Sequence, residues 1–241
     1  MSQSPEPSLP LVVRIAHRIP YLPPAVHFVR VRYNAWRSAH ERSAKNITRK
    51  NTLRAYNRVY RSDSLLAEYL VPPRLEFYDE VAERCARLTP RRVIDVGCGT
   101  GHLLRSLVDR APVEPQLVVG VDRSRTGIRR ARTLLPQGTF VVGDLYRLRL
   151  DAERFDLVLC TEVLEHVREP ALAVDALCRL CAPGGRVAVT VPDGAQDSWE
   201  GHVNFWDEDE FRAFLAPHAL VSIDPIEGGR TFLAWLAPGE R

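Results

Sequence analysis

Between residues 92 and 191 the sequence alternates short apolar runs with segments whose apolar residues recur every three or four positions. The apolar runs predict five strands, at 92–96, 117–121, 139–142, 155–160 and 186–191. Strands that are apolar on both faces and separated by helices favour a parallel sheet covered on both sides. The sequence therefore predicts an α/β fold built on a doubly wound, mostly parallel sheet.

The C-terminal part of the chain breaks this alternation. Apolar runs at 220–226 and 231–236 flank Glu227-Gly228-Gly229-Arg230, which is typical of the turn in an antiparallel hairpin. These two strands bring the expected sheet to seven strands. A parallel sheet that ends in an antiparallel hairpin is not the arrangement of a dinucleotide-binding domain.

The N-terminal part of the chain is expected to be helical and strongly basic. Residues 1–62 hold 12 of the 33 Lys and Arg but only 2 of the 30 Asp and Glu, which gives this segment a charge of +10. We expect residues 1–74 to form a basic helical extension or lid, and residues 75–241 to form the main domain. Such an extension is typical of three arrangements: it binds an anionic partner, it docks onto the acidic remainder of the chain, or it is a helical face exposed to solvent. Helical spacing is clearest at Val26, Val29, Tyr33 and Trp36.

The strongest motif follows the first predicted strand. The run from Asp95 continues through Gly97, Cys98, Gly99 and Gly101 into a helical segment. Glycines let the backbone turn sharply and let a ligand approach closely. On its own, such a glycine loop is ambiguous between several nucleotide cofactors.

Acidic residues at the ends of the next two strands narrow the choice of cofactor. Asp122 ends the second strand and is followed by Arg123, and a carboxylate there can accept hydrogen bonds from both ribose hydroxyls. Asp144 and Leu145 follow the third strand, where an acid can bind an adenine amino group. The three strand ends form one edge of the sheet, the edge at which open sheets bind ligands.

In this order the motifs resemble those of the class I S-adenosylmethionine-dependent methyltransferases. The stretches 155–160 and 182–186 also match that family, and the resemblance covers residues 75–236. It implies that Asp95, Gly97, Gly99 and the loop around Cys160 and Thr161 hold the methionine half of S-adenosylmethionine. A NAD-binding Rossmann domain is the alternative, and the lack of a hydride-acceptor domain disfavours it.

The residues after the fourth strand bear on the methyl acceptor. Methylases of nucleic-acid base amino groups usually carry Asn/Asp-Pro-Pro-aromatic there, whereas this chain continues from Thr161 into Glu162. If residues 162–166 are helical, Glu162, Glu165 and His166 lie on one face. His202, which follows the fifth strand, is then able to approach them. Two carboxylates and two imidazoles can bind magnesium, manganese or zinc.

The same residues also allow a mechanism without a metal, in which His166 acts as a general base beside Glu162 and His202. The pattern resembles the ubiquinone-biosynthesis O-methyltransferases and the small-RNA terminal ribose methyltransferases. The first resemblance implies a hydroxylated small-molecule acceptor: a catechol or quinone precursor, a sugar or a polyketide-like metabolite. The second implies RNA held by the basic extension. We expect Phe205 and Trp206, with Tyr60 or Tyr78, to wall an apolar acceptor pocket.

The remaining features of the sequence mainly exclude other kinds of protein and site. No apolar run approaches 18 residues, so no transmembrane segment is expected. Five cysteines without framework spacing indicate a reducing cytoplasm. Cys178 and Cys181 form a single C-x-x-C, which we interpret as helix core rather than a zinc site. Docking of the extension on an anionic membrane and a non-catalytic regulator are two further alternatives.

Overall fold

The computed structural model describes residues 51–112, 114–148, 154–197, 199 and 201–238. The helices are α4 (Leu53–Arg61), α5 (Asp63–Tyr69), α6 (Pro72–Ala86), α7 (His102–Arg110), α8 (Arg125–Leu134), α9 (Pro170–Leu180) and α10 (Glu208–Leu215). The strands are β1 (Arg92–Val96), β2 (Leu117–Asp122), β3 (Thr139–Val142), β4 (Phe155–Thr161), β5 (Cys181–Pro192), β6 (Leu220–Ile226) and β7 (Thr231–Leu236). Short 3₁₀ turns add η1 (Leu145–Arg147), η2 (Leu164–His166) and η3 (Ala216–His218).

The strands form one seven-stranded sheet in the order β3-β2-β1-β4-β5-β7-β6. Strands β1 to β5 pair in parallel, and β7 pairs antiparallel with both β5 and β6. The predicted fold class is therefore confirmed, hairpin included. Strand β5 begins five residues before the predicted start, at Cys181 instead of Arg186. The strand order reverses between β1 and β4, the place where such sheets bind ligands.

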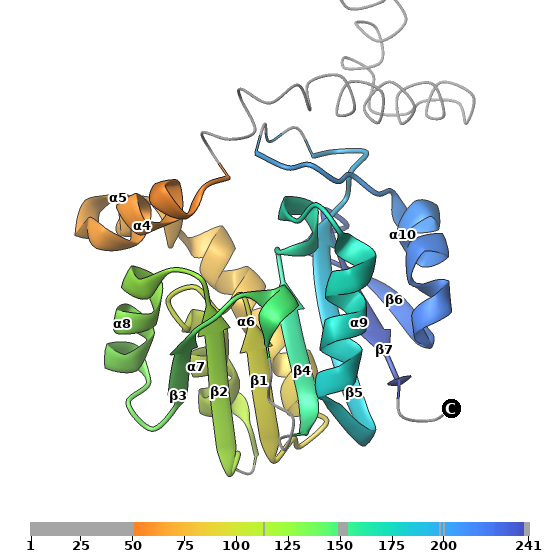
Figure 1. Cartoon of the computed structure of the whole chain (residues 1–241), viewed down its shortest axis with the longest axis horizontal. Helices are drawn as coiled ribbons and strands as arrows, with labels where there is room; N and C mark the ends of the chain where they lie inside the picture. The colour runs from red at the N-terminus through yellow and green to blue at the C-terminus, as the bar shows by residue number, and fades with distance from the viewer. Residues whose placement is uncertain (1–50, 113, 149–153, 198, 200, 239–241) are drawn as a thin grey trace, which may run out of the picture.

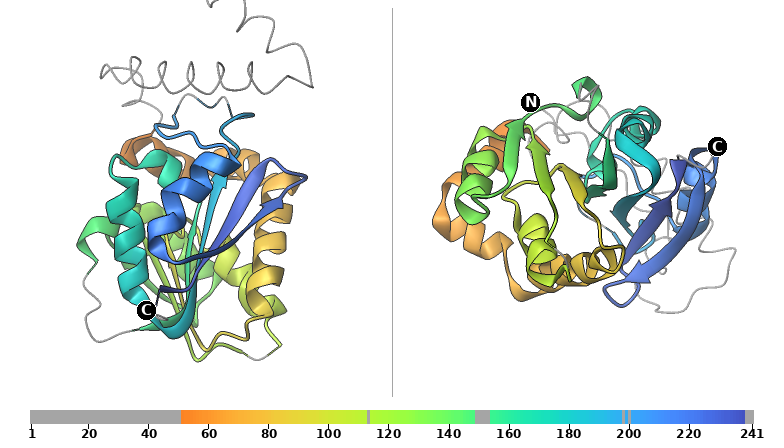
Figure 2. Two further views of the ribbon diagram at one scale, coloured as in Figure 1. Left: turned by 90° about the vertical axis from the view of Figure 1, so that its right-hand side faces the viewer. Right: turned by 90° about the horizontal axis from the view of Figure 1, so that it is seen from below.

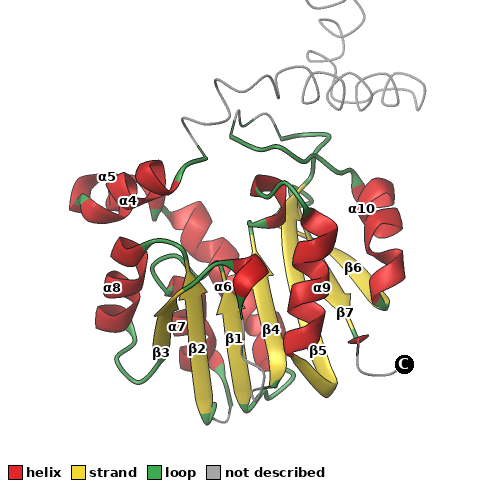
Figure 3. Cartoon of the chain, in the orientation of Figure 1, coloured by secondary structure: helices red, strands yellow, loops and turns green. Residues whose placement is uncertain are grey.

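Helices cover both faces of the sheet (Figure 1; Figure 3). On one face α6, α7 and α8 bury side chains such as Leu104 and Ile128 against β1, β2 and β4. On the other face α9 and α10 bury Leu177 and Phe211. Figure 2 shows the same layers from the side and from below. Both faces are thus removed from water, as the continuous apolar strands require.

The described part of the N-terminal extension consists of α4 and α5, which lie beyond the carboxyl ends of the strands (Figure 1). The expected boundary between residues 74 and 75 falls in the first turn of α6. Pro72 and Pro73 are the first two residues of α6. Proline is tolerated there because the first N–H groups of a helix make no hydrogen bond within the helix. The helical pattern at 26–36 and most of the basic charge lie outside the described residues.

The fold also bears on two smaller expectations. Cys178 lies in the last turn of α9, but Cys181 is the first residue of β5, so the pair is not contained in one helix. Within the ranges described above, no helix combines the length and the apolar character that a membrane crossing needs.

Candidate active site

A cavity of about 740 Å³ lies at the carboxyl ends of β1, β2 and β4, beneath α4 and α5. Its volume is within the range of small-molecule and cofactor sites. Most of the residues predicted to bind the cofactor line it: Asp95, Gly97, Cys98, Gly99, Asp122, Arg123, Asp144, Leu145 and Thr161. The acceptor-side residues Glu162, Glu165, His166 and His202 line the same cavity.

Gly101 and Cys160 were predicted at the cofactor, but neither lines the cavity. The Cys160 side chain is fully buried in the core beneath α9. Gly101 caps α7 with a φ of +83°, and a Cβ there would lie 3.0 Å from the Cβ of Ala131 in α8. Its role in this fold is to let α7 pack closely on α8.

The glycine loop itself approaches the next loop of the site closely. Gly97 has a φ of +96°, which favours glycine, and an added Cβ would lie 2.4 Å from Cγ2 of Val163. A Cβ on Gly99 would lie 3.0 Å from the Tyr60 hydroxyl. Positions 97 and 99 therefore have no room for a side chain, and the loop contributes its backbone to the cavity wall there.

Asp122 is held in place by backbone amides. Its Oδ2 accepts a hydrogen bond from the Gly99 amide at 3.0 Å, and its Oδ1 accepts one from the Ser124 amide at 2.6 Å. Burial raises the pKa of Asp122, and the two amide bonds oppose that shift. A carboxylate has about four acceptor positions, so two remain for other donors such as ribose hydroxyls.

Asp144, which the sequence predicts to bind adenine, lines the cavity. Its Oδ1 accepts a hydrogen bond from the Tyr146 amide at 3.0 Å and thereby caps η1. Its Oδ2 lies 3.4 Å from Nε of Arg123, which is largely exposed. Arg123 and Asp144 thus form a polar edge of the cavity, next to the exposed ring of Tyr146.

We call the part of the cavity lined by the residues predicted to bind S-adenosylmethionine the donor half. Asp95 is its most deeply buried carboxyl. It is 1% exposed, and its Oδ1 has no hydrogen-bond partner among the described residues. Burial, with a further contribution from the negative charge of Asp122, raises the pKa of Asp95 to about 8. A buried acceptor without a partner costs free energy, which a donor group on a ligand would recover.

Arg74 was not anticipated from the sequence, because its position in α6 gives no motif. Its guanidinium lines the cavity, lies over the rings of Tyr69 and Phe77, and is 3.8 Å from Oε2 of Glu162. Arg74 and Asp95 therefore place a cation and a carboxyl in the same cavity. This pair fits the carboxylate and ammonium of an amino-acid moiety.

Glu165, His166 and His202 converge, with one ligand atom from each within 4.8 Å of the others. Oε1 of Glu165 is 3.6 Å from Nε2 of His166 and 3.9 Å from Nε2 of His202. Both Glu165 carboxyl oxygens and Nδ1 of His166 are buried without a hydrogen-bond partner in the described part of the chain. Unpartnered oxygen and nitrogen ligands of this kind fit a divalent metal ion.

Burial dominates the electrostatics of this cluster. The pKa of Glu165 is raised, first by burial and then by the negative charge of Glu162. The pKa of His166 is lowered to about 3, again mainly by burial and then by the charge of His202. His166 is therefore neutral at physiological pH, the form in which an imidazole binds metals or accepts a proton.

The expectation that residues 162–166 form one helical face is wrong. Only Leu164–His166 makes a helical turn, and Glu162 has a φ of +54°. The Glu162 amide donates to O and Oγ1 of Thr190 in β5, so this residue ends the strand pairing instead of starting a helix. Its Oε1 accepts from Thr190 Oγ1 at 3.2 Å and its Oε2 faces Arg74. The structure thus brings three of the four proposed metal ligands together and places Glu162 beside them.

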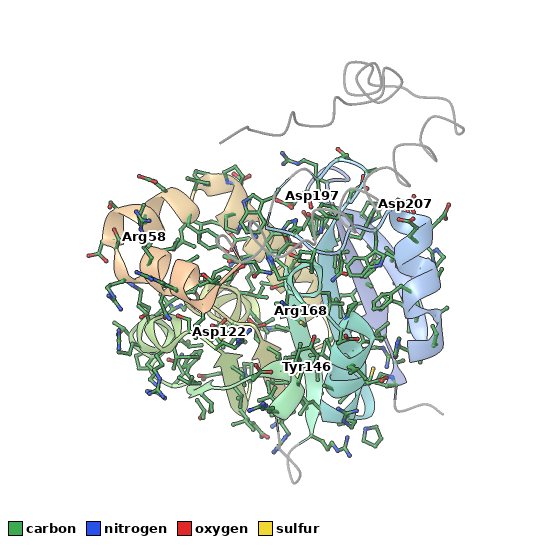
Figure 4. All side chains as sticks on the ribbon, turned by 45° about the horizontal axis from the view of Figure 1, so that its top comes forward. Arg58, Asp122, Tyr146, Arg168, Asp197 and Asp207 are labelled. Atoms are coloured by element: carbon green, nitrogen blue, oxygen red, sulfur yellow. The ribbon has the colours of Figure 1, made fainter. Side chains whose placement is uncertain are left out.

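The loop between β5 and α10 supplies two residues that the sequence did not indicate, Asp197 and Trp199. Oδ1 of Asp197 accepts the Trp199 amide at 3.0 Å, and Oδ2 makes a short hydrogen bond with Nδ1 of His202. The Trp199 ring is 4.8 Å from the ring of His202 and 5.4 Å from that of His166. Asp197 and Asp122 lie on different sides of the cavity (Figure 4).

The expected aromatic wall is right in part. Tyr60 and Tyr78 line the cavity, whereas Phe205 and Trp206 do not. Trp206 stacks instead on Phe214 of α10, with ring centroids 5.1 Å apart. Trp199, which is 40% exposed, is the tryptophan that lines the cavity in place of Trp206.

Residues 69–223 match a family model described as a methyltransferase domain. Because the match covers more than half of the chain, it identifies the family to which the chain belongs. The chain belongs to the class I S-adenosylmethionine-dependent methyltransferases.

The curated relatives of this methyltransferase have names that describe different methylation reactions. The ubiquinone biosynthesis O-methyltransferase of Alkalilimnicola ehrlichii is 40% identical over 116 residues, which are 45% of this chain and 44% of that protein. The trans-aconitate 2-methyltransferase of Variovorax paradoxus is 32% identical over 106 residues, 44% of this chain and 40% of that protein. The chain spans about half the length of the curated relatives it matches.

Solved structures support the fold of the methyltransferase. The N-methyltransferase NodS of Bradyrhizobium japonicum WM9, in complex with S-adenosyl-L-homocysteine, superposes with a TM-score of 0.62 at 19% identity. The superposition covers 77% of this chain and 97% of NodS.

Proposed function

We propose that this methyltransferase transfers the methyl group of S-adenosylmethionine to a hydroxyl oxygen of a small molecule. The acceptor would be a catechol or quinone precursor, a sugar or a polyketide-like metabolite. The observation that carries the proposal is that one cavity holds both the residues predicted to bind the donor and the Glu165–His166–His202 cluster. In this cluster both Glu165 oxygens and Nδ1 of His166 have no hydrogen-bond partner among the described residues. The relatives named ubiquinone biosynthesis O-methyltransferase add support for an oxygen acceptor.

The donor half of the cavity suits S-adenosylmethionine group by group. Asp122 has acceptor positions left for the ribose hydroxyls, and Asp144 is available to the adenine amino group. Asp95, whose Oδ1 has no hydrogen-bond partner among the described residues, would pair with the ammonium group, and Arg74 with the carboxylate. The glycine loop would lie against the ligand through its backbone.

The acceptor half suits a divalent ion, and magnesium, manganese or zinc would be held by Glu165, His166 and His202. A bound ion would lower the pKa of an acceptor hydroxyl and orient it. Asp197 behind His202 fixes the imidazole with Nε2 toward Glu165, as carboxylates do for metal-binding histidines. Glu162 is the candidate for a fourth ligand. Without a metal, a histidine of the cluster would take the acceptor proton.

The helices α4 and α5 serve as the lid in this proposal. They contribute Tyr56, Tyr60 and Tyr69 to the cavity wall. Such a cover would exclude water from the methyl transfer. Acceptor size would then be set by these rings and by Trp199 across the cavity.

The test is a screen of hydroxylated acceptors with labelled donor, run with and without a chelator. Glu165→Gln, His166→Ala and His202→Ala should each abolish most activity, and the double variants should lose little more, because the ion is already lost. Donor affinity should change far less than activity, because the residues proposed to bind the donor lie on other loops. His218→Ala, in η3 outside the cavity, is the matched control and should keep full activity.

The two mechanisms give opposite results in this experiment. Inactivation by chelator, reversed by added metal, would establish the metal mechanism. Full activity in chelator, with separate and smaller effects of Glu162→Gln and His202→Ala, would establish the general-base mechanism. An enzyme that methylates only amines or carboxylates would refute the oxygen acceptor.

RNA ribose methylation is the second candidate, and one surface favours it. Helices α4 and α8 together carry seven arginines and no Asp or Glu. In α6, α7 and α10 every arginine lies within 4.0 Å of a carboxylate oxygen, whereas in α4 and α8 Arg130 alone does so among the described residues, through Asp63. The double change Arg58→Glu/Arg129→Glu should then weaken salt-dependent RNA binding, whereas Arg105→Glu on α7 should not. Binding that is insensitive to the double change would remove this candidate.

A reducing cytoplasm as the location belongs to the same proposal. Cys85, Cys98 and Cys160 are buried thiols, and burial raises the pKa of each. Thiols of this kind are inert and need no oxidising compartment. Fractionation of the native host would test the location.

A further inference from the structure

Helix α4 contacts the donor half of the cavity through Asn57. Oδ1 of Asn57 accepts a hydrogen bond from the Ser124 hydroxyl at 2.6 Å and from the Thr126 amide at 3.4 Å. The Ser124 amide in turn donates to Oδ1 of Asp122. Asn57 therefore connects α4, through one residue, to the carboxylate proposed to hold the ribose.

The N-terminal end of α4 contacts the acceptor half. Nδ2 of Asn51 donates to the carbonyl oxygen of His166 at 2.8 Å, and the Tyr56 hydroxyl lies 3.5 Å from Nε2 of His166. The Tyr56 hydroxyl is also 3.5 Å from Oδ1 of Asn51. The backbone and the ring of His166 are thus both in contact with the same two residues.

The C-terminal end of α4 is fixed to the donor side as well. Arg130 of α8 donates to the carbonyl oxygens of Tyr60 and Arg61 and pairs with Asp63. The Tyr60 hydroxyl lies over the glycine loop, 3.0 Å from the position of a Gly99 Cβ. A ligand that enters the glycine loop therefore meets α4 directly.

We propose that α4 couples donor binding to the placement of His166, with Asn51, Tyr56 and Asn57 as positioning residues. The inference rests on the proposed function through the assignment of Asp122 to the donor ribose. A donor that bonds to Asp122 stabilises the loop at Ser124, and this loop holds α4 at Asn57. With α4 in place, His166 is held in the orientation that the acceptor needs. By linkage, an acceptor or ion on His166 strengthens donor binding by the same factor.

Hydrogen exchange with S-adenosylhomocysteine, which binds without turnover, tests the coupling directly. In the wild type the ligand should slow exchange in three places: the glycine loop, α4 and residues 164–167. In Asn57→Ala at saturating ligand, the glycine loop should stay protected, while the protection of 164–167 falls about tenfold, within the usual range of coupling between sites. Tyr56→Phe keeps the ring and should retain protection of α4 but not of 164–167.

Kinetics provide the second measurement. Asn57→Ala should raise the donor KM about fivefold, the value of one neutral hydrogen bond. Tyr56→Phe and Asn51→Ala should lower kcat and leave donor affinity without acceptor within about twofold, because these two residues contact His166 and not the loop at Ser124. The combined Asn57→Ala/Tyr56→Phe variant should lose less than the product of the two single losses. Glu68→Ala is the control, because this exposed residue lies on the neighbouring helix α5 and outside the cavity.

Each outcome identifies what has failed. Protection of 164–167 that persists in Asn57→Ala at saturation, or multiplicative losses in the double variant, would overturn the coupling. Protection of the glycine loop alone in the wild type would do the same and leave the donor site intact. If the ligand protects no segment, the proposed function itself fails.

Discussion

Replacing Asp95 by asparagine tests the electrostatics of the donor site without any knowledge of the acceptor. Asparagine has nearly the shape of the protonated carboxyl but cannot ionise. In the folded protein the pKa of Asp95 is about 8, whereas the unfolded value is about 3.9. Between these values the folded state binds a proton that the unfolded state has lost. The wild type therefore becomes less stable as the pH rises through this window, and Asp95→Asn does not share that loss.

The size of the effect follows from the two pKa values. Each pH unit inside the window changes the free energy of unfolding by about 1.4 kcal/mol. From about pH 5 to about pH 8 the wild type should lose up to about 4 kcal/mol relative to Asp95→Asn. This is a large part of the total stability of a domain. Asp95 is 1% exposed, so solvent screening reduces the figure little.

Urea unfolding of both proteins across this pH range measures the difference. Asp109→Asn, on the exposed side of α7, is the control and should follow the wild type. Calorimetry adds a second result: donor binding near pH 7 should release about one proton from the wild type and none from Asp95→Asn, because the ammonium group pairs with the ionised carboxylate. A stability difference that is the same at both ends of the range would refute the reasoning.

Three further predictions concern single contacts. Asp122→Ala should weaken donor binding by roughly 1.5–3 kcal/mol, measured by calorimetry, through loss of hydrogen bonds to a charged group. Gly127→Ala should lower both donor affinity and the melting temperature, at about 1–3 kcal/mol, because its Cβ would lie 2.7 Å from the carbonyl oxygen of Gly99. Asn204→Ala should lower the melting temperature and the activity together, since Nδ2 of Asn204 donates to two carbonyl oxygens around η2 at 2.8 and 2.7 Å. Unchanged melting of Asn204→Ala would show that η2 is held by other contacts.

The sheet and the donor loop were predictable because periodicity and local motifs determine them. Each strand is a short apolar run, and each donor residue follows a strand end. Asp122 and Asp144 come together only because parallel strands share their carboxyl edge, a property of the fold class that the sequence already indicated. Strand pairing brings Asp122 and Asp144 to one cavity, whereas Cys160, also predicted near a strand end, is buried in the core.

The acceptor side was harder, because its geometry depends on contacts between distant segments. The spacing of Glu162, Glu165 and His166 favours a helix, but the backbone bonds of Glu162 to Thr190 prevail. Similarly, Trp199 and Trp206 are equally plausible wall residues until the path of their loop is known. Asp197 carries no motif, and its role is visible only through the bond to His202.

That Asp197 side chain also affects how new acceptor specificities can evolve. One carboxylate holds both the Trp199 backbone and the His202 ring, so a substitution that reshapes this wall of the cavity also disturbs the imidazole. Variants of residues 197–202 would often lose activity before gaining a new substrate. Arg230 lines the same cavity from the turn between β6 and β7, where its side chain donates to the Glu227 carbonyl oxygen. Changes of the Arg230 side chain should therefore alter the acceptor range at less cost to the chemistry than changes at 197–202.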